Sequence, residues 1–332
     1  MKSRTKFEID DKTIERIFLN AEISDIQSVQ PLGKGEFNAV YQVKTPSKDY
    51  VLKVAPSSDT EVLPYEKNMM KAEVFWYAEL RENTIINVPK VYVYDDSKRI
   101  IGAEYFIMDK IEGTPQFKQK MTKKEKANVT PTIAKMTASM HNVTNDKYGY
   151  VQQTLYDDWY QALRSMTVSL LDSLKAKGHR SYQGEKLLKY IDKNKEILQK
   201  AECSMVNYDI WDMNMLVNRI NGELVYYWID PERCFWGDRA ADFICLQVSK
   251  PYLKDKKIAI NAYNQVSRIP IEINKEINIR YGIMMAYMGL LLETEKYFRY
   301  TVLHAGWWRN IFIGKFYYYR AGFKTLKSER LI

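Results

Sequence analysis

The chain has 332 residues, of which 46% are hydrophobic and 27% charged, and its formal net charge at pH 7 is +9. This composition is ordinary for a globular protein, and the length suits about two domains with a sizeable core. Three cysteines without a CxxC pair argue against a disulfide framework, three scattered histidines argue against zinc, and no apolar run could span a bilayer. Residues 1–18 are charged throughout and lack the apolar region of a secretion signal, so we expect a cytoplasmic protein.

The first third of the chain reads mainly as strand. Residues 25–55 contain short β-branched and aromatic runs that are broken by glycines and a turn. Residues 65–82 have apolar side chains at helical spacing, and two further strands follow at 89–96 and 103–111. The expected order is therefore strand, strand, strand, helix, strand, strand, in a small sheet-rich lobe over residues 1–112.

The remaining residues, 113–332, read as a larger helical lobe, and the boundary falls near Gly113 to Pro115. Two short strand-like runs flank Asn221-Gly222, which is a strong hairpin signal. The apolar run 281–292 is too short to cross a bilayer and predicts a buried core helix. Other helices are expected at 127–143, 156–176 and 185–201.

The C-terminal residues 307–332 are basic and aromatic. Such a stretch is compatible with nucleic-acid binding. A final helix with its aromatic side chains packed inward and its lysines outside is the favoured alternative, so no nucleic-acid partner is expected. The oligomeric state is not determined by any of these patterns.

Gly33 and Gly35 lie in a turn between two predicted strands. Glycine lets backbone N–H groups approach phosphate oxygens without a side-chain clash, so this turn is a candidate phosphate-binding loop. Glycine-rich hairpins are also common without that role. The third glycine of the protein-kinase pattern is replaced here by Asn38.

Lys53 lies within an apolar strand, where an ammonium group without an anionic partner is costly. Because it follows the glycine turn, it would point toward nucleotide phosphates, and a carboxylate from the next helix would hold it. Glu73 is the first candidate for that carboxylate, and Glu66 is the second. A solvent-facing lysine at the strand edge is the alternative.

Asp209 and Asn214 lie five residues apart, directly before the predicted hairpin. The hairpin returns the chain, so that Asp230 at its far end lies beside Asn214. A carboxylate and a carboxamide that face one point are oxygen ligands suited to Mg²⁺. Asp209 is then left to orient the hydroxyl that accepts a phosphoryl group. Each residue alone fits a loop cap, but their order after the glycine turn and the lysine predicts a phosphotransferase.

This ordered set resembles the aminoglycoside phosphotransferase and choline kinase family, the small-molecule relatives of protein kinases. The family's G-x-x-N-x-V-Y-x-V stretch is met at 35–43, and its strand lysine and helix glutamate at Lys53 and Glu73. Its H-G-D-x-W-x-x-N-x-L loop aligns with 207–216, and its I-D-x-E…G-D-x-x-x-D stretch with 229–242. The resemblance implies a two-lobed α+β protein-kinase-like fold, with a small antiparallel-sheet N-lobe and a larger helical C-lobe.

The resemblance also implies ATP or GTP as phosphoryl donor, Mg²⁺ as metal and a small-molecule hydroxyl as acceptor. It assigns backbone contacts with adenine to Asp109 through Ile111, and the bracing of the catalytic loop to Asp242. Asn207 and Tyr208 depart from the family's histidine and glycine. An asparagine keeps the hydrogen-bonding capacity of histidine, whereas the tyrosine crowds a tight backbone. A catalytically silent nucleotide-binding module is therefore an alternative of a different class.

The acceptor is expected to be an aminoglycoside, with choline, homoserine or a sugar as alternatives within the family. The net charge of +9 opposes a polycationic acceptor at long range, although pocket charge overrides it locally. A quaternary ammonium would need an aromatic box, for which Trp159, Trp211 and Trp236 are candidates. The candidate carboxylates for a cationic acceptor, each more often an ordinary solvated group, are Asp157, Asp158, Asp212, Glu232, Glu293 and Glu295.

Overall fold

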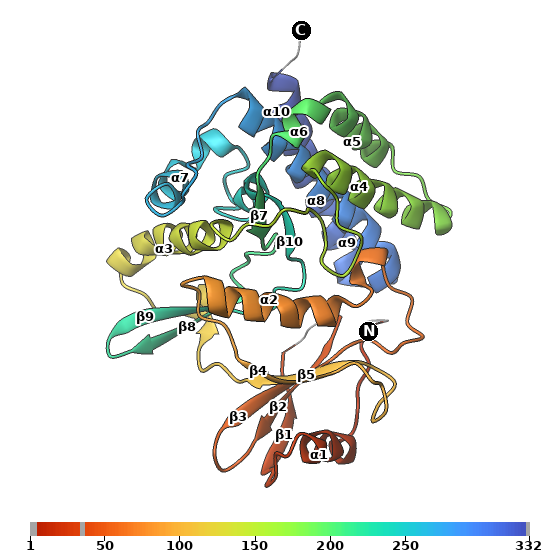
Figure 1. Cartoon of the computed structure of the whole chain (residues 1–332), viewed down its shortest axis with the longest axis vertical. Helices are drawn as coiled ribbons and strands as arrows, with labels where there is room; N and C mark the ends of the chain where they lie inside the picture. The colour runs from red at the N-terminus through yellow and green to blue at the C-terminus, as the bar shows by residue number, and fades with distance from the viewer. Residues whose placement is uncertain (1–4, 34–36, 330–332) are drawn as a thin grey trace.

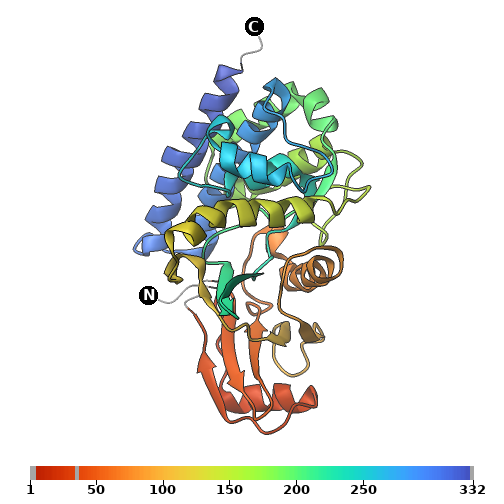
Figure 2. The ribbon, with the colours of Figure 1, turned by 90° about the vertical axis from the view of Figure 1, so that its left-hand side faces the viewer.

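The computed structural model of the chain describes residues 5–33 and 37–329 (Figure 1). A five-stranded antiparallel sheet near the N-terminus, with strand order β1-β2-β3-β5-β4, precedes a mainly helical part. The predicted α+β division is confirmed. Figure 2 shows the two parts stacked along the long axis of the molecule. The strands of the large sheet are β1 (Ser28–Pro31), β2 (Ala39–Lys44), β3 (Asp49–Val54), β4 (Val91–Asp95) and β5 (Tyr105–Asp109).

The two faces of this sheet pack against different helices, α1 (Asp11–Asn20) and α2 (Met69–Asn83). Successive residues of a strand point to opposite faces. In β3, Leu52 belongs to the apolar cluster that contains α1, and Val51 belongs to the cluster that contains α2. Lys53 shares the face of Val51, so the alternation of β3 directs this lysine toward α2.

The helical part is organised around α8 (Lys275–Arg299), whose buried residues occur all around the helix. The predicted buried helix at 281–292 is thereby confirmed. The predicted helix at 185–201 is divided into two by Asn194. The remaining helices are α3 (Lys123–His141), α4 (Trp159–Ala176), α5 (Tyr182–Lys193), α6 (Lys195–Gln199), α7 (Lys257–Tyr263), α9 (Ala305–Phe312) and α10 (Arg320–Ser328), with short 3₁₀ segments η1 (Pro64–Glu66), η2 (Gln116–Lys118), η3 (Arg239–Ile244) and η4 (Leu253–Asp255).

Two small sheets lie in this part. The predicted hairpin is present as β8 (Met215–Ile220) and β9 (Glu223–Trp228), and β6 (Thr114–Pro115) pairs with β8. Asn221 and Gly222 have φ values of 51° and 86°, the left-handed pair that a two-residue hairpin turn needs. The other small sheet pairs β7 (Cys203–Val206) with β10 (Phe235–Asp238).

The C-terminal segment packs on α8 through α10 and a π-helical stretch, η5 (Ile313–Tyr319). Tyr318 and Tyr319 are buried, so the expectation of inward-facing aromatics is correct there. It is wrong for Trp308 and Phe312, whose exposed fractions are 59% and 67%. No helix among the described residues is long and apolar enough to cross a membrane.

Lys256 is fully buried and donates hydrogen bonds to the backbone carbonyls of Leu246 and Gln247. Burial lowers the pKa of this lysine to about 7. Between pH 7 and the ordinary lysine pKa of about 10.4, the unfolded chain therefore binds more protons than the folded chain, and the free energy of unfolding rises with pH. From pH 7 to pH 9, wild type should gain roughly 2 kcal/mol relative to Lys256→Met, measured by urea unfolding. Parallel pH profiles for the two proteins would contradict this prediction.

Candidate active site

The glycine turn leads from β1 into β2. Gly33 has a φ of 73°, which favours glycine, and Leu32 N–H donates to Val40 O at 2.7 Å. Gly35 lies outside the described residues. Asn38 is buried and its Nδ2 donates to Glu232 Oε2 at 3.2 Å. The end of the turn is thus tied to a carboxylate that lies far along the sequence.

Lys53 meets Glu73 inside the molecule. Its Nζ lies 2.8 and 2.7 Å from the two carboxylate oxygens of Glu73, and both side chains are buried. The same Nζ lies 2.5 Å from Asp230 Oδ1. Glu66, the second candidate for this pair, instead accepts hydrogen bonds from Arg299. The structure therefore brings Lys53 together with Glu73 and Asp230, and not with Glu66.

Asp242 anchors the loop that begins at Asn207. Its carboxylate accepts hydrogen bonds from the backbone N–H groups of Asn207 and Tyr208 at 3.0 and 2.6 Å. Asn207 Oδ1 accepts the N–H of Asp209 at 2.9 Å. This asparagine therefore fulfils the expected hydrogen-bonding role. His141 also contacts Asp242, with 2.9 Å between Nε2 and Oδ2, a contact between residues so distant in sequence that their spacing carries no signal of it.

Tyr208 occupies the position where the family has glycine. Its φ is 60°, an unusual value for a bulky residue. The side chain is fully buried, and its hydroxyl donates to Met284 O of α8 at 2.7 Å. The tyrosine therefore fits a left-handed position by extending into the helical core, and the loop keeps its hydrogen bonds to Asp242.

Asp209 and Asn214 face each other across this loop, since Asn214 Nδ2 donates to Asp209 Oδ2 at 3.0 Å. Burial raises the pKa of Asp209 to about 6, and the neighbouring Arg233 opposes this rise. Ile229 N–H donates to Asn214 O at 2.9 Å, which fixes the far end of the hairpin, and hence Asp230, beside Asn214. The hairpin thus brings the chain back to Asn214, as the sequence predicts.

Three carboxylates gather around Lys53. Ligand oxygens of Glu73, Asp230 and Glu232 all lie within 4.8 Å of one another. Burial and the charge of Asp230 raise the pKa of Glu232 to about 8, whereas Lys53 lowers the pKa of Asp230 against the effect of burial. One ammonium group faces three acids, so the cluster has a deficit of positive charge that suits a hard divalent cation.

A second buried ionic cluster adjoins Asp209 and was missed by sequence reasoning. Arg233 Nη2 lies 2.8 Å from Glu295 Oε1, and Arg233 Nε lies 3.5 Å from Asp209 Oδ2. Glu295 also accepts the hydroxyl of Tyr65 at 2.7 Å and lies 3.5 Å from Arg299. Tyr65 belongs to η1 and Glu295 to α8, so this cluster joins the segment before α2 to the helical part.

Most of the carboxylates proposed for a cationic acceptor have other partners. Asp157 pairs with Lys147, and Glu293 accepts hydrogen bonds from Ser181 and Tyr319. Asp158 caps α4, while Glu232 and Glu295 belong to the two buried clusters. Asp212 lines a cavity of about 560 Å³, and Glu293 lines a smaller cavity of about 310 Å³.

Two of the three candidate tryptophans for an aromatic box lie in the hydrophobic core. Trp159 is fully buried and stacks on Phe235, with ring centroids 5.5 Å apart. Trp236 is buried and packs edge-on against Trp76. Both indoles belong to the hydrophobic core because α4 and β10 carry them inward. Trp236 also borders a cavity beside α2, and Trp211 borders another cavity beside the loop that begins at Asn207.

The proposed adenine contact falls on the end of β5 and the segment after it. Asp109 donates its backbone N–H to Lys90 O at 2.9 Å, and its carboxylate accepts Lys48 Nζ at 2.6 Å. That N–H and that side chain are therefore engaged within the protein. Ile111 is partly exposed, two residues after β5 ends.

The comparisons with known proteins agree on one family. The sequence model of the phosphotransferase enzyme family matches residues 28–256. A "Probable ketoamine kinase" from Lactiplantibacillus plantarum is 25% identical over 226 residues, which make up 66% of this chain and 74% of that protein.

Solved structures of the same architecture cover nearly the whole chain. A candidate fructosamine-3-kinase from Haemophilus somnus has a TM-score of 0.66 at 18% identity and covers 95% of this chain and 97% of its own. A choline kinase from Streptococcus pneumoniae has a TM-score of 0.59 at 15% identity and covers 96% of this chain and 99% of its own. The expected kinase-like fold is confirmed, and the chain belongs to the phosphotransferase enzyme family of small-molecule kinases.

Proposed function

We propose that this kinase transfers the γ-phosphoryl group of ATP or GTP to a hydroxyl group of a small amine-bearing molecule. The observation that carries the proposal is the meeting of Lys53, Glu73 and Asp230 beside the loop of Asp209 and Asn214. In this assignment residues 1–112 bind the nucleotide. Residues 113–332 supply the catalytic loop and the acceptor site.

The nucleotide is assigned to the space beneath the turn of Gly33, Gly35 and Asn38, with the backbone at Asp109 to Ile111 beside its base. Lys53 would pair with phosphate oxygens while Glu73 holds its ammonium group in place. Burial lowers the pKa of Lys53, but the nearby carboxylates of Asp230 and Glu73 outweigh it and leave that pKa well above its usual range, so the lysine is charged.

Asn214 and Asp230 fit a magnesium ion. The amide nitrogen of Asn214 is committed to Asp209, which leaves its amide oxygen as the ligand atom. Asp230 supplies a carboxylate, and Glu232 adds another within the same cluster. A bound Mg²⁺ would neutralise charge on the nucleotide phosphates.

Asp209 is assigned the acceptor hydroxyl. As the hydroxyl oxygen bonds to the γ-phosphorus, the bond from that phosphorus to the β,γ-bridging oxygen breaks, and the hydroxyl proton passes to the Asp209 carboxylate. The products are a phosphate monoester and a nucleoside diphosphate. A pKa of about 6 leaves Asp209 mostly ionised near neutral pH and able to accept a proton.

Ketoamines are the acceptor class that we favour, because the curated relative carries that name and a structural relative is described as acting on fructosamine. The named acceptors of other relatives, aminoglycosides, aminopropanol and choline, are also amine-bearing alcohols. The net charge of +9 weighs against the polycationic aminoglycosides. The burial of Trp159 and Trp236 weighs against a choline-type aromatic box.

Tyr208 gives little support to a catalytically silent module, since the loop hydrogen bonds are intact around it.

The test of the proposed function is release of ADP or GDP from the purified protein with Mg-ATP or Mg-GTP. Acceptors would be 1-amino-1-deoxyfructose, an aminoglycoside, choline, homoserine and a pentose, beside an Asp209→Ala control. We expect release that depends on the amino sugar and vanishes in the control. Nucleotide binding without any acceptor-dependent release would contradict the proposal.

A further inference from the structure

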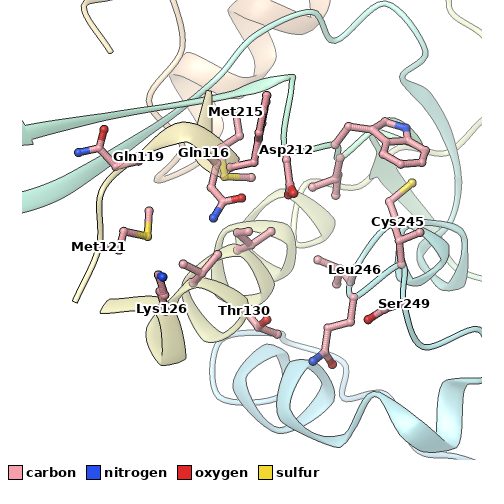
Figure 3. A pocket seen from close by; sticks show the side chains of 17 residues that line it. Gln116, Gln119, Met121, Lys126, Thr130, Asp212, Met215, Cys245, Leu246 and Ser249 are labelled. Atoms are coloured by element: carbon pink, nitrogen blue, oxygen red, sulfur yellow. The ribbon is translucent and has the colours of Figure 1, made fainter. Parts of the chain in front are cut away.

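A cavity of about 560 Å³ opens beside the catalytic loop, between α3, η2 and the segment that follows η3 (Figure 3). It holds three residues of that loop, Ile210, Trp211 and Asp212, and one of β8, Met215. Asp209 is not part of its lining.

Asp212 is the acid of this lining, and it has no partner. Within residues 5–33 and 37–329, its carboxylate makes no ion pair and accepts no hydrogen bond. In Figure 3 the side chain points into the cavity, between Gln116 on one side and Leu246 and Ser249 on the other. Asp212 is an exposed residue, so its carboxylate is accessible from the cavity.

The backbone fixes Asp212 in place. Gln116 N–H donates to Asp212 O at 3.2 Å, and Trp211 N–H donates to Asp209 O at 2.8 Å. Asn214 N–H donates to Trp211 O at 2.9 Å. The loop is therefore compact between Asp209 and Asn214. Three residues span at most about 10 Å, so the backbone at Asp212 lies near that at Asp209.

The rest of the lining combines apolar and polar side chains with one basic residue, Lys126. Trp211, Ile133 and Leu246 supply apolar surface, while amide and hydroxyl side chains offer both donors and acceptors. The amide and hydroxyl residues are Gln116, Gln119, Gln247, Thr130 and Ser249.

We propose that this cavity binds the amine-bearing part of the acceptor, with Asp212 as the counter-ion of its ammonium group. The inference rests on the proposed function and deepens it, because Asp212 would then decide between amines and neutral alcohols. Asp209, three residues away in the same loop, would still orient the hydroxyl group of the acceptor. The carboxylate of Asp212 would gain a cation that none of the described residues provides.

The test compares wild type with Asp212→Asn on two matched pairs, 1-amino-1-deoxyfructose with fructose and 1-amino-2-propanol with 1,2-propanediol. We expect KM for the amines to rise about 10–100-fold, since hydrogen bonds to charged groups are strong. KM for the nucleotide and for the neutral alcohols should stay within about twofold. Asp172→Asn, the same charge change on the exposed face of α4, should alter none of these values. An equal rise in KM for the amines and for the neutral alcohols would overturn the proposal.

Thr130→Leu provides a second variant, because it narrows the cavity without changing charge. Thr130→Leu should raise KM for both the amine and the neutral alcohol of each pair. Unchanged KM values would show that the acceptor binds elsewhere. Calorimetric titration of the two amines in the absence of nucleotide separates this inference from the proposed function. Amine binding that Asp212→Asn weakens supports the cavity even if no acceptor is phosphorylated. Turnover of amines that Asp212→Asn leaves untouched overturns the cavity and keeps the kinase assignment.

Discussion

Asp209→Asn is expected to lower kcat by about 10²–10⁴-fold while the dissociation constant of the nucleotide stays within a few-fold of wild type. The substitution keeps the size of the side chain but removes the oxygen that accepts the hydroxyl proton. Asn207 Oδ1 would still accept the N–H of residue 209, because that bond uses the backbone. The loss should therefore fall on the chemical step and not on the loop.

Steady-state release of ADP gives kcat for this variant, and titration with nucleotide gives its affinity. Asp172→Asn serves as the matched control, since it removes one exposed carboxylate of α4. Far-ultraviolet circular dichroism and urea unfolding would show that the variant is folded. Retention of more than about a tenth of wild-type kcat would be incompatible with Asp209 as the proton acceptor.

The parts of this site that the sequence predicts are those set by local geometry. Period-two alternation in β3 is enough to place Lys53 on the face of Val51 and toward the next helix. Asn221-Gly222 has the backbone preference of a two-residue turn, so the return of the chain to Asp230 follows from two residues.

The contacts that the sequence does not predict join residues far apart in the chain. Arg299 and Glu66 are separated by 233 residues, and nothing in either neighbourhood marks them as partners. Trp159 and Trp236 look equally suited to a cleft or a core, and only the packing of Trp159 on Phe235 and of Trp236 on Trp76 decides between them.

The helix α1 was also not predicted from the sequence. Its apolar residues Ile14, Ile17 and Phe18 form a narrow stripe within a charged segment, and this stripe is buried against the sheet. The charged residues around the stripe make the segment polar on average. The stripe is therefore recognised only when the spacing of apolar residues over those ten positions is compared with the period of a helix.

Arg233→Met is expected to lower the free energy of unfolding by about 3–5 kcal/mol, because it removes one partner of a buried ion pair. Among residues 5–33 and 37–329, Glu295 would keep only the hydroxyl of Tyr65 at 2.7 Å and the more distant Arg299 at 3.5 Å. Asp209 would lose its neighbouring guanidinium group as well. Urea unfolding, followed by tryptophan fluorescence, measures this loss.

A double-mutant cycle with Glu295→Gln isolates the pair from the rest of the cluster. If Arg233 and Glu295 stabilise each other, the double variant should be more stable than the sum of the two single losses predicts, by about 1–3 kcal/mol. The cycle matters for function because Arg233 contacts Asp209, whereas Glu295 reaches η1 through Tyr65. Coupling would mean that the segment before α2 and the proposed proton acceptor are held by one buried cluster. Strict additivity of the two losses would show instead that Arg233 and Glu295 are independent, and that this pair does not link Asp209 to η1.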